Sequence, residues 1–159
     1  MIIALFSALL LSLQPSTEPR VIGWGDLLPE EELAEELSDG PVIDHESGGR
    51  VAQTGSSQTV AELEGAYIRM PGYLLPLDYS EKGLVRAFLL VPYYGACIHV
   101  PPPPPNQIVF VDTGENPVKS RGLWDPVWVT GTMRLQGNDN NLGDTAYTLE
   151  LSLLEDYED

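Results

Sequence analysis

Two side chains that could share one chemical task lie close together in the chain, at Cys97 and His99. If residues 96–100 are extended, both side chains project from the same face, because side chains alternate along an extended chain. A thiolate and an imidazole are ligands that suit zinc or copper. The spacing therefore predicts Cys97 and His99 as metal ligands for Zn or Cu, and it assigns no catalytic and no cofactor-binding residue.

Two ligands do not complete a metal site, so the remaining donors must come from elsewhere. Within the chain the candidate donors are His45, Met70, Asp78, Tyr94 and Asp112. A second copy of the chain or a partner protein could also supply them. The sequence leaves this choice open.

Two other interpretations of Cys97 and His99 stay open as well. His99 could lower the pKa of Cys97, which is the minimal arrangement for a nucleophilic thiol. Free cysteine is also among the most buried residue types, so Cys97 could simply pack in the core while His99 hydrogen-bonds carbonyl groups of the following prolines. The chain lacks the signatures of serine hydrolases, zinc proteases, phosphate-binding loops and dinucleotide folds, and we therefore expect a protein that is not an enzyme.

Five consecutive prolines, Pro101–Pro105, follow the Cys97 and His99 pair directly. Proline has no backbone N–H, so this segment cannot be a central strand. In the polyproline II conformation it would form a rod of about 15 Å. We expect a rigid strap that leaves the sheet just after His99 and fixes its surroundings.

Short apolar runs separated by turn signals predict strands throughout the second part of the chain. The runs are residues 66–70, 73–75, 85–91, 107–111, 127–135 and 147–153. The run at 85–91 is nearly continuous, which suits a strand buried on both faces, and the last two runs alternate apolar and polar residues. The pattern predicts a mainly β fold, a small five- to six-stranded antiparallel barrel.

The first part of the chain has a different composition. Residues 1–14 are uncharged and mostly apolar, which predicts a signal peptide, and no membrane span remains after its removal. Residues 15–59 are expected to form a short acidic helix, beginning near Asp26 and Pro29, and then a flexible loop. Residues 60–159 form the predicted barrel domain.

Charge limits the possible partners. The chain has 159 residues, with 8 Lys and Arg against 24 Asp and Glu, and a net charge of −16. Nucleic acid is therefore not an expected partner, because phosphate binding needs clustered basic residues. The charge is densest in residues 18–64, which hold 12 acidic and 2 basic residues. Cys97 is the only cysteine, so no internal disulfide can form.

The sequence around the prolines resembles a bacterial family known as a domain of unknown function. The resemblance rests on GACIHVPPPPPNQ at 95–107, on MPGYLLPL at 70–77 and FLLVPY at 88–93, on WGDLLP at 24–29, and on DPVWVTG at 125–131. It implies a five-stranded barrel of the oligonucleotide/oligosaccharide-binding (OB) type and export to the periplasm, with no established activity. Some members resemble lipoproteins, but this chain has no lipidation cysteine after its apolar segment.

Together these observations favour a periplasmic accessory protein. The resemblance extends to proteins encoded beside envelope ABC transporters in settings that suggest metal supply. One hypothesis is therefore a protein that binds Zn or Cu through Cys97 and His99 or assists such a transporter. The alternative is an interaction module of an envelope complex that binds no metal, and a thiol enzyme is the third class.

Overall fold

The structure is a computed structural model that describes residues 18–39 and 53–158. Its strands are β1 (Arg20–Val21), β2 (Tyr67–Tyr79), β3 (Val85–Val91), β4 (Val109–Asp112), β5 (Asp125–Arg134) and β6 (Tyr147–Asp156). Its helices are the 3-10 helices η1 (Trp24–Leu27), η2 (Ala61–Leu63) and η3 (Pro105–Gln107) and the α-helix α1 (Glu30–Asp39). The predicted signal peptide and His45 lie outside the described residues.

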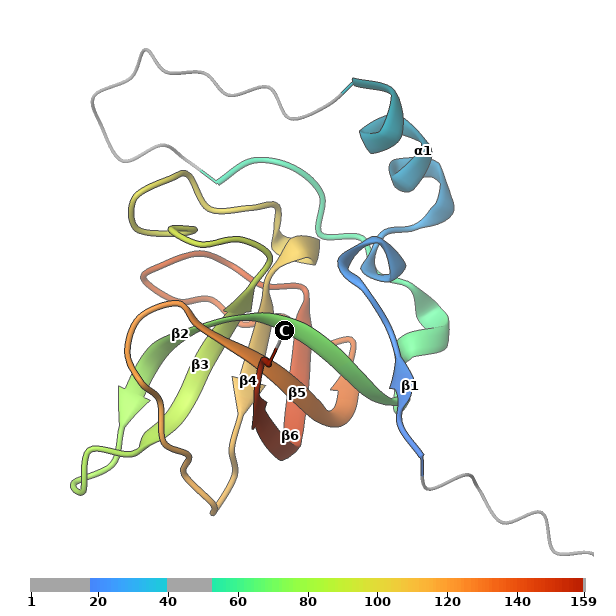
Figure 1. Cartoon of the computed structure of the whole chain (residues 1–159). Coiled ribbons are helices and arrows are strands. Elements are labelled where there is room, and N and C mark those ends of the chain that lie inside the picture. The colour runs from blue at the N-terminus through green and yellow to red at the C-terminus, as the bar shows by residue number, and fades with distance from the viewer. Residues whose placement is uncertain (1–17, 40–52, 159) are drawn as a thin grey trace, which may run out of the picture.

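Five of the strands close into a barrel (Figure 1). The order is β2-β3-β4-β6-β5, and β5 pairs again with β2, while β1 adds one short strand beside β2. The predicted mainly β, OB-like barrel is confirmed. The prediction that all pairs are antiparallel was wrong, because β4 and β6 pair in parallel, as do β1 and β2. β4 and β6 run in the same direction because β5 lies between them in the chain and runs in the opposite direction.

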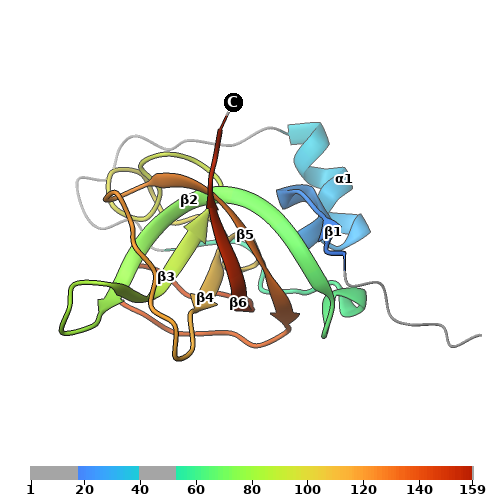
Figure 2. The ribbon, with the colours of Figure 1, turned by 60° about the horizontal axis from the view of Figure 1, so that its bottom comes forward.

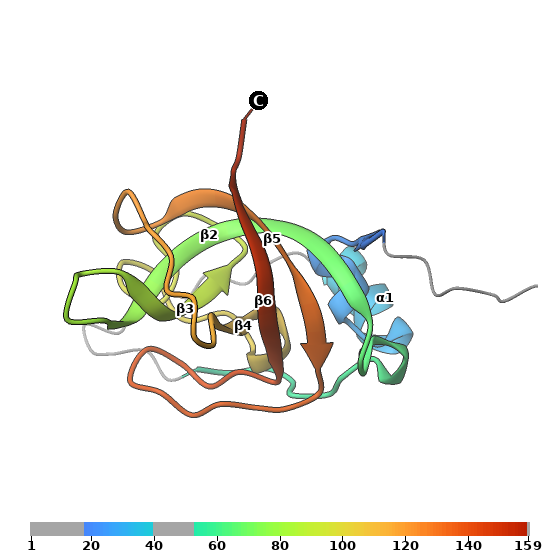
Figure 3. The ribbon, with the colours of Figure 1, turned by 90° about the horizontal axis from the view of Figure 1, so that it is seen from below.

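The predicted break at Pro71-Gly72 is instead a bend inside β2, which runs unbroken for 13 residues. Figures 2 and 3 show β2 as one long, curved strand. Its first part pairs with β5 as far as Leu74, and its second part pairs with β3 from Tyr73 onward. Because Gly72 has no side chain, Leu90 and Trp24 pack closely against its backbone, where a Cβ would lie 2.6 Å from Leu90 Cγ. The bend is thus a close packing point and not a turn.

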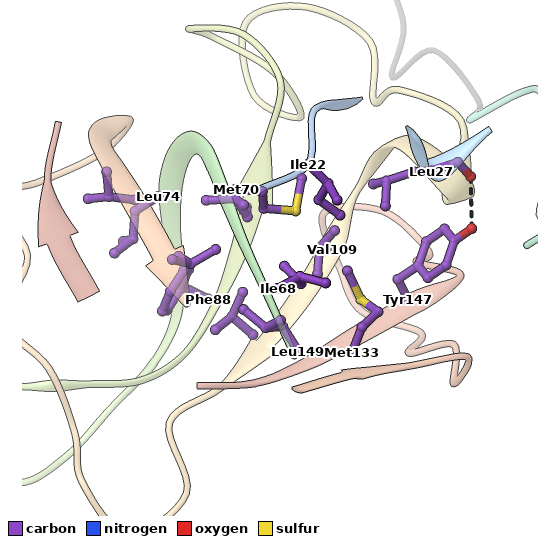
Figure 4. Close-up of a cluster of buried hydrophobic side chains, with 14 of the residues drawn as sticks. Ile22, Leu27, Ile68, Met70, Leu74, Phe88, Val109, Met133, Tyr147 and Leu149 are labelled. Atoms are coloured by element: carbon purple, nitrogen blue, oxygen red, sulfur yellow. Dashed lines mark hydrogen bonds between the residues drawn. The ribbon is translucent and has the colours of Figure 1, made fainter. Parts of the chain in front are cut away.

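The barrel interior holds the main hydrophobic core, shown in Figure 4. Alternate residues of the strands point inward, and Ile68, Phe88 and Leu149 are among those fully buried. Tyr147 closes one end, since its buried hydroxyl donates a hydrogen bond to the Leu27 carbonyl at 2.8 Å and accepts one from the Val60 N–H at 2.8 Å. This side chain fixes both η1 and the segment before η2 on the barrel.

A second hydrophobic core lies on the outer face of three strands. It contains the alternate residues of β2 and β3, such as Leu75, Leu89 and Val91, together with Ala96 and Trp124 from the connecting segments. Phe110 of β4 and Leu142 pack against it. β3 is thus buried on both faces, as its continuous apolar run predicted.

The acidic helix forms as α1, with Glu30, Glu31 and Glu32 in its first turn. The helix begins after Pro29, and Asp26 accepts a hydrogen bond from Gly23 N–H at 2.8 Å within the preceding η1 instead of capping α1. Among the described residues, no helix is both long and apolar enough to span a membrane.

Candidate functional site

Residues 92–100 form a compact turn immediately after β3. The carbonyl oxygen of Gly95 accepts hydrogen bonds from the N–H groups of Ile98 at 3.4 Å, His99 at 2.9 Å and Val100 at 3.2 Å. Gly95 has φ +88°, a conformation that glycine adopts without strain. Residues 96–100 are therefore not extended, and the condition under which Cys97 and His99 would share one face of a strand is not met. The two residues lie in one folded turn.

Trp124, which precedes β5, holds this turn in place. Its ring is 5% exposed, and its Nε1–H donates a hydrogen bond to the carbonyl of Ala96 at 3.2 Å. The ring also lies 5.0 Å from that of His99 and 4.9 Å from that of Tyr94, while Tyr94 meets Tyr73 edge to face at 6.4 Å. We call residues 92–100 with Trp124 the aromatic turn.

The backbone is strained at two points of the aromatic turn. Cys97 has φ +67° and Trp124 has φ +54°, and among the described residues no other non-glycine residue has a positive φ. A bulky residue in this region costs free energy and persists only where surrounding contacts enforce it. That both strained residues lie in one place is typical of a site kept for function.

The environment of Cys97 disfavours the thiolate form. Burial raises the pKa of its thiol from 9.0 to about 11, whereas a nucleophilic cysteine needs a lowered pKa. The pKa of the neighbouring Tyr93 is also raised, first by burial and then by the charge that Cys97 would carry. The thiol is therefore protonated near neutral pH, which is opposite to the condition that the thiol-enzyme hypothesis requires.

This shift predicts slow alkylation of Cys97. At pH 8 the thiolate fraction should be about 100-fold lower than at a pKa of 9.0, and greater intrinsic nucleophilicity recovers about tenfold of this. We expect iodoacetamide to react about tenfold more slowly with the folded protein than with the same protein in urea, and the rate to rise until about pH 11. Equal alkylation rates in the folded protein and in urea would contradict the raised pKa of Cys97.

The raised pKa of Cys97 also makes the stability of the protein depend on pH. The stabilisation that the buried, protonated thiol contributes is complete below pH 9.0 and is lost as the pH rises to about 11.

The donors considered for a metal are scattered. Within the described ranges no group of three or more His, Cys, Asp or Glu side chains could hold a metal ion. Met70 is fully buried inside the barrel, Asp78 pairs with Arg86 at 3.0 Å, and Asp112 accepts a hydrogen bond from Gly114 N–H. Of these candidate donors, only Tyr94 lies in the aromatic turn with Cys97 and His99. Metal binding by Cys97 and His99 therefore stays a prediction.

The proline strap leaves the sheet, as its lack of N–H groups predicted. Pro101–Pro104 lie in neither helix nor strand, and Pro105 begins η3. The carbonyl oxygens of four of these prolines accept hydrogen bonds from residues other than His99. The donors are Tyr93 Oη to Pro101, Gln53 Nε2 to Pro103, Gln107 N to Pro104 and Ala146 N to Pro105. The strap is thus tied to the barrel independently of His99.

Comparison with known proteins gives a family but no activity. Residues 24–156 match the family described as "Protein of unknown function (DUF3299)". The crystal structure of a DUF3299 family protein from Pseudomonas aeruginosa PAO1 is 39% identical, with a TM-score of 0.71, over 89% of this chain and 97% of that chain. No curated protein matches the chain.

Proposed function

The chain belongs to the DUF3299 family of proteins of unknown function, and from this premise we propose that it is an exported accessory protein that binds another protein of the bacterial cell envelope and is not an enzyme. The observation that carries the proposal is the apolar surface of the aromatic turn. The resemblance to proteins encoded beside ABC transporters makes such a transporter the first candidate partner.

The aromatic turn presents apolar side chains to solvent beside its buried anchor. The residues exposed here are Tyr93 (43%), Tyr94 (67%), Ile98 (46%) and Val100 (42%), and Leu123 (52%) directly precedes Trp124 in the chain. Several large apolar side chains exposed on one turn are typical of a protein contact. The hydrogen bonds to Gly95 O and from Trp124 Nε1 hold the patch in one shape, which lowers the entropy cost of binding.

Site-specific photocrosslinking tests the protein contact. With a photoreactive residue in place of Ile98, we expect a crosslinked species of defined mass in intact cells. The matched control places the same residue at Leu153, which is 51% exposed on β6. Tyr94→Ala should reduce the crosslink from position 98 about tenfold, because truncation of a central aromatic residue removes a hot spot. The same adducts from both positions, or none from position 98, would refute the contact.

Export rests on the apolar segment of residues 2–13 and on the family resemblance. Fusion of the chain to alkaline phosphatase, an enzyme active only after export, gives a direct measurement. We expect high phosphatase activity from the full-chain fusion. Deletion of residues 1–14 should remove most of this activity. Equal activity in both fusions would contradict an N-terminal export signal.

Metal binding by Cys97 and His99 is the second candidate function. The observation that favours it is their common position in one fixed turn, with Cys97 held in a strained backbone conformation. Two ligands per chain leave room for ligands from a second molecule. We expect protein purified under reducing, chelator-free conditions to take up zinc or copper, and the pair Cys97→Ser and His99→Ala to abolish uptake. Equal metal content in both proteins would exclude the site.

A further inference from the structure

A groove lies beside Tyr73, whose ring also contacts that of Tyr94. Its volume is about 400 Å³, and it is lined by Trp24, Pro71, Gly72, Tyr73, Pro92, Pro126 and Tyr157. We call it the aromatic–proline groove. The size is within the range of known ligand sites, and the lining contains three aromatic rings and three prolines but no charged side chain.

The walls of this groove are fixed by the barrel. Trp24 lies over the bend of β2, where a Cβ on Gly72 would be 3.0 Å from its Cζ2. Pro126 pairs with Tyr73 across the β2–β5 ladder, and its carbonyl accepts a hydrogen bond from Tyr157 N–H at 3.1 Å. The ring of Tyr157 stacks on that of Trp128 with centroids 5.7 Å apart. The groove is therefore preformed, although Tyr157 is close to the end of the chain.

Trp128, the support for Tyr157, is itself held by a cation. The guanidinium of Arg69 lies 4.0 Å from the centre of the Trp128 ring, and Arg69 Nε pairs with Glu155 at 3.1 Å. Such a cation–π contact is attractive because the face of the indole ring is electron-rich. The stack of Arg69, Trp128 and Tyr157 thus fixes the position of the Tyr157 ring at the edge of the groove.

The lining chemistry is that of a site for a polyproline II segment. Proline-rich peptides dock in grooves formed by aromatic side chains, because flat rings pack against pyrrolidine rings and the ligand is already stiff. Such a ligand exposes carbonyl groups and so needs hydrogen-bond donors. The indole N–H of Trp24 and the hydroxyls of Tyr73 and Tyr157 donate to no residue in the ranges 18–39 and 53–158, so they are available.

The charges near the groove indicate a basic partner. Within residues 18–39 and 53–158, four carboxylates lie within two positions of Trp24 or Tyr157 in the sequence, namely Asp26, Glu155, Asp156 and Glu158. Glu155 pairs with Arg69 at 3.1 Å and Asp156 with Arg121 at 3.7 Å, whereas Asp26 and Glu158 have no basic partner among the described residues. The whole chain carries a net charge of −16, which attracts cationic segments and repels acidic ones.

Two other occupants are less compatible with the groove. A second copy cannot insert its own proline strap, because Pro103 is buried and the strap is bonded to Gln53 and Ala146 in its own chain. An oligosaccharide would also stack on aromatic rings, but its hydroxyls require several polar side chains, and the lining has none beyond those of Trp24, Tyr73 and Tyr157.

We propose that the aromatic–proline groove binds a proline-rich segment of another protein, in the polyproline II conformation and with a flanking Arg or Lys. This inference goes beyond the proposed contact at the aromatic turn, since the groove and that turn share only Pro92 and the groove would bind its ligand even if that contact failed. It assigns a role to Trp24, Tyr157 and the three lining prolines that the fold alone does not require.

Titration with peptides tests the proposal on the full chain. The probe is a proline homopeptide with an arginine at each end, and the comparison probes are the same peptide with glutamates at its ends and a cello-oligosaccharide. Binding is followed by the amide and indole signals in nuclear magnetic resonance spectra. We expect saturable shifts of the Trp24 indole and of residues lining the groove with the arginine peptide, weaker shifts with the glutamate peptide, and none with the sugar.

Variants separate binding from folding. Tyr157→Ala should lower the affinity for the arginine peptide about tenfold or more. Tyr157→Phe keeps the ring and should lower this affinity less. The matched control is Tyr79→Ala, which removes a tyrosine that is 52% exposed at the other end of β2 and should leave the affinity unchanged. Absence of binding by wild type, saturable binding of the sugar alone, or equal binding of both peptides would each overturn the proposal.

Discussion

Replacing Gly131 with alanine is expected to destabilise the barrel by about 3 kcal/mol or more, because the added Cβ meets main chain and not a movable side chain. A Cβ at Gly131 would overlap the carbonyl oxygen of Glu150 and would lie 3.0 Å from its carbonyl carbon. The register of β5 and β6 shifts between Thr130 and Gly131, so the two backbones approach closely at this irregularity. Equilibrium unfolding in urea gives the change in free energy.

The matched control for this substitution is Gly23→Ala. A Cβ at Gly23 would come no closer than 3.9 Å to another side chain, at Asp26, and Gly23 has an extended backbone. We expect a change of at most about 0.5 kcal/mol. If Gly131→Ala and Gly23→Ala unfold at the same urea concentration, then β5 and β6 do not close the barrel as described.

Replacing Trp124 with alanine is expected to destabilise the protein by about 3 kcal/mol, the usual cost of removing a large buried ring. The indole is 5% exposed in the second core and donates the hydrogen bond to Ala96 O. Its loss also removes the ring contacts of Tyr94 and His99. Besides the lower free energy of unfolding, we expect faster amide exchange in residues 96–100, which would show that the turn has lost its anchor.

Leu123→Ala is the control for Trp124→Ala, since Leu123 is the preceding residue but is 52% exposed. Its removal should change the free energy of unfolding by at most about 0.5 kcal/mol. Normal amide protection of residues 96–100 in Trp124→Ala would show that the hydrogen bonds to Gly95 O hold the turn without the tryptophan.

The barrel could be predicted from sequence because its strands have strong local patterns. The continuous run in β3 and the alternation in β5 and in the first half of β6 predict which residues are buried, and the structure agrees. Beyond Leu151 the register shift between β5 and β6 reverses the alternation, so that Leu153 is exposed and Leu154 packs against the core. The break predicted in β2 was wrong for a reason that only the tertiary structure shows. Pro71-Gly72 has the composition of a turn, but the glycine is there because the side chains of Leu90 and Trp24 occupy the space that a Cβ would fill.

The candidate sites were harder to predict, because they depend on contacts between distant residues. The expectation of an extended Cys97–His99 pair used local geometry alone, whereas the turn is set by Gly95 and by a tryptophan 28 residues beyond Ala96. The aromatic–proline groove combines residues near the start, the middle and the end of the chain. Each of these residues has an ordinary sequence context, so no local signal points to the groove.

The second hydrophobic core has a consequence for ligands of the barrel itself. OB folds bind oligonucleotides and oligosaccharides on the face of their second and third strands, which correspond here to β3 and β4. In this protein Ala96, Trp124 and Leu142 cover the outer side chains of those strands. The chain thus covers with its own residues the face that other OB folds use for ligands, and a partner would have to bind the surfaces around it.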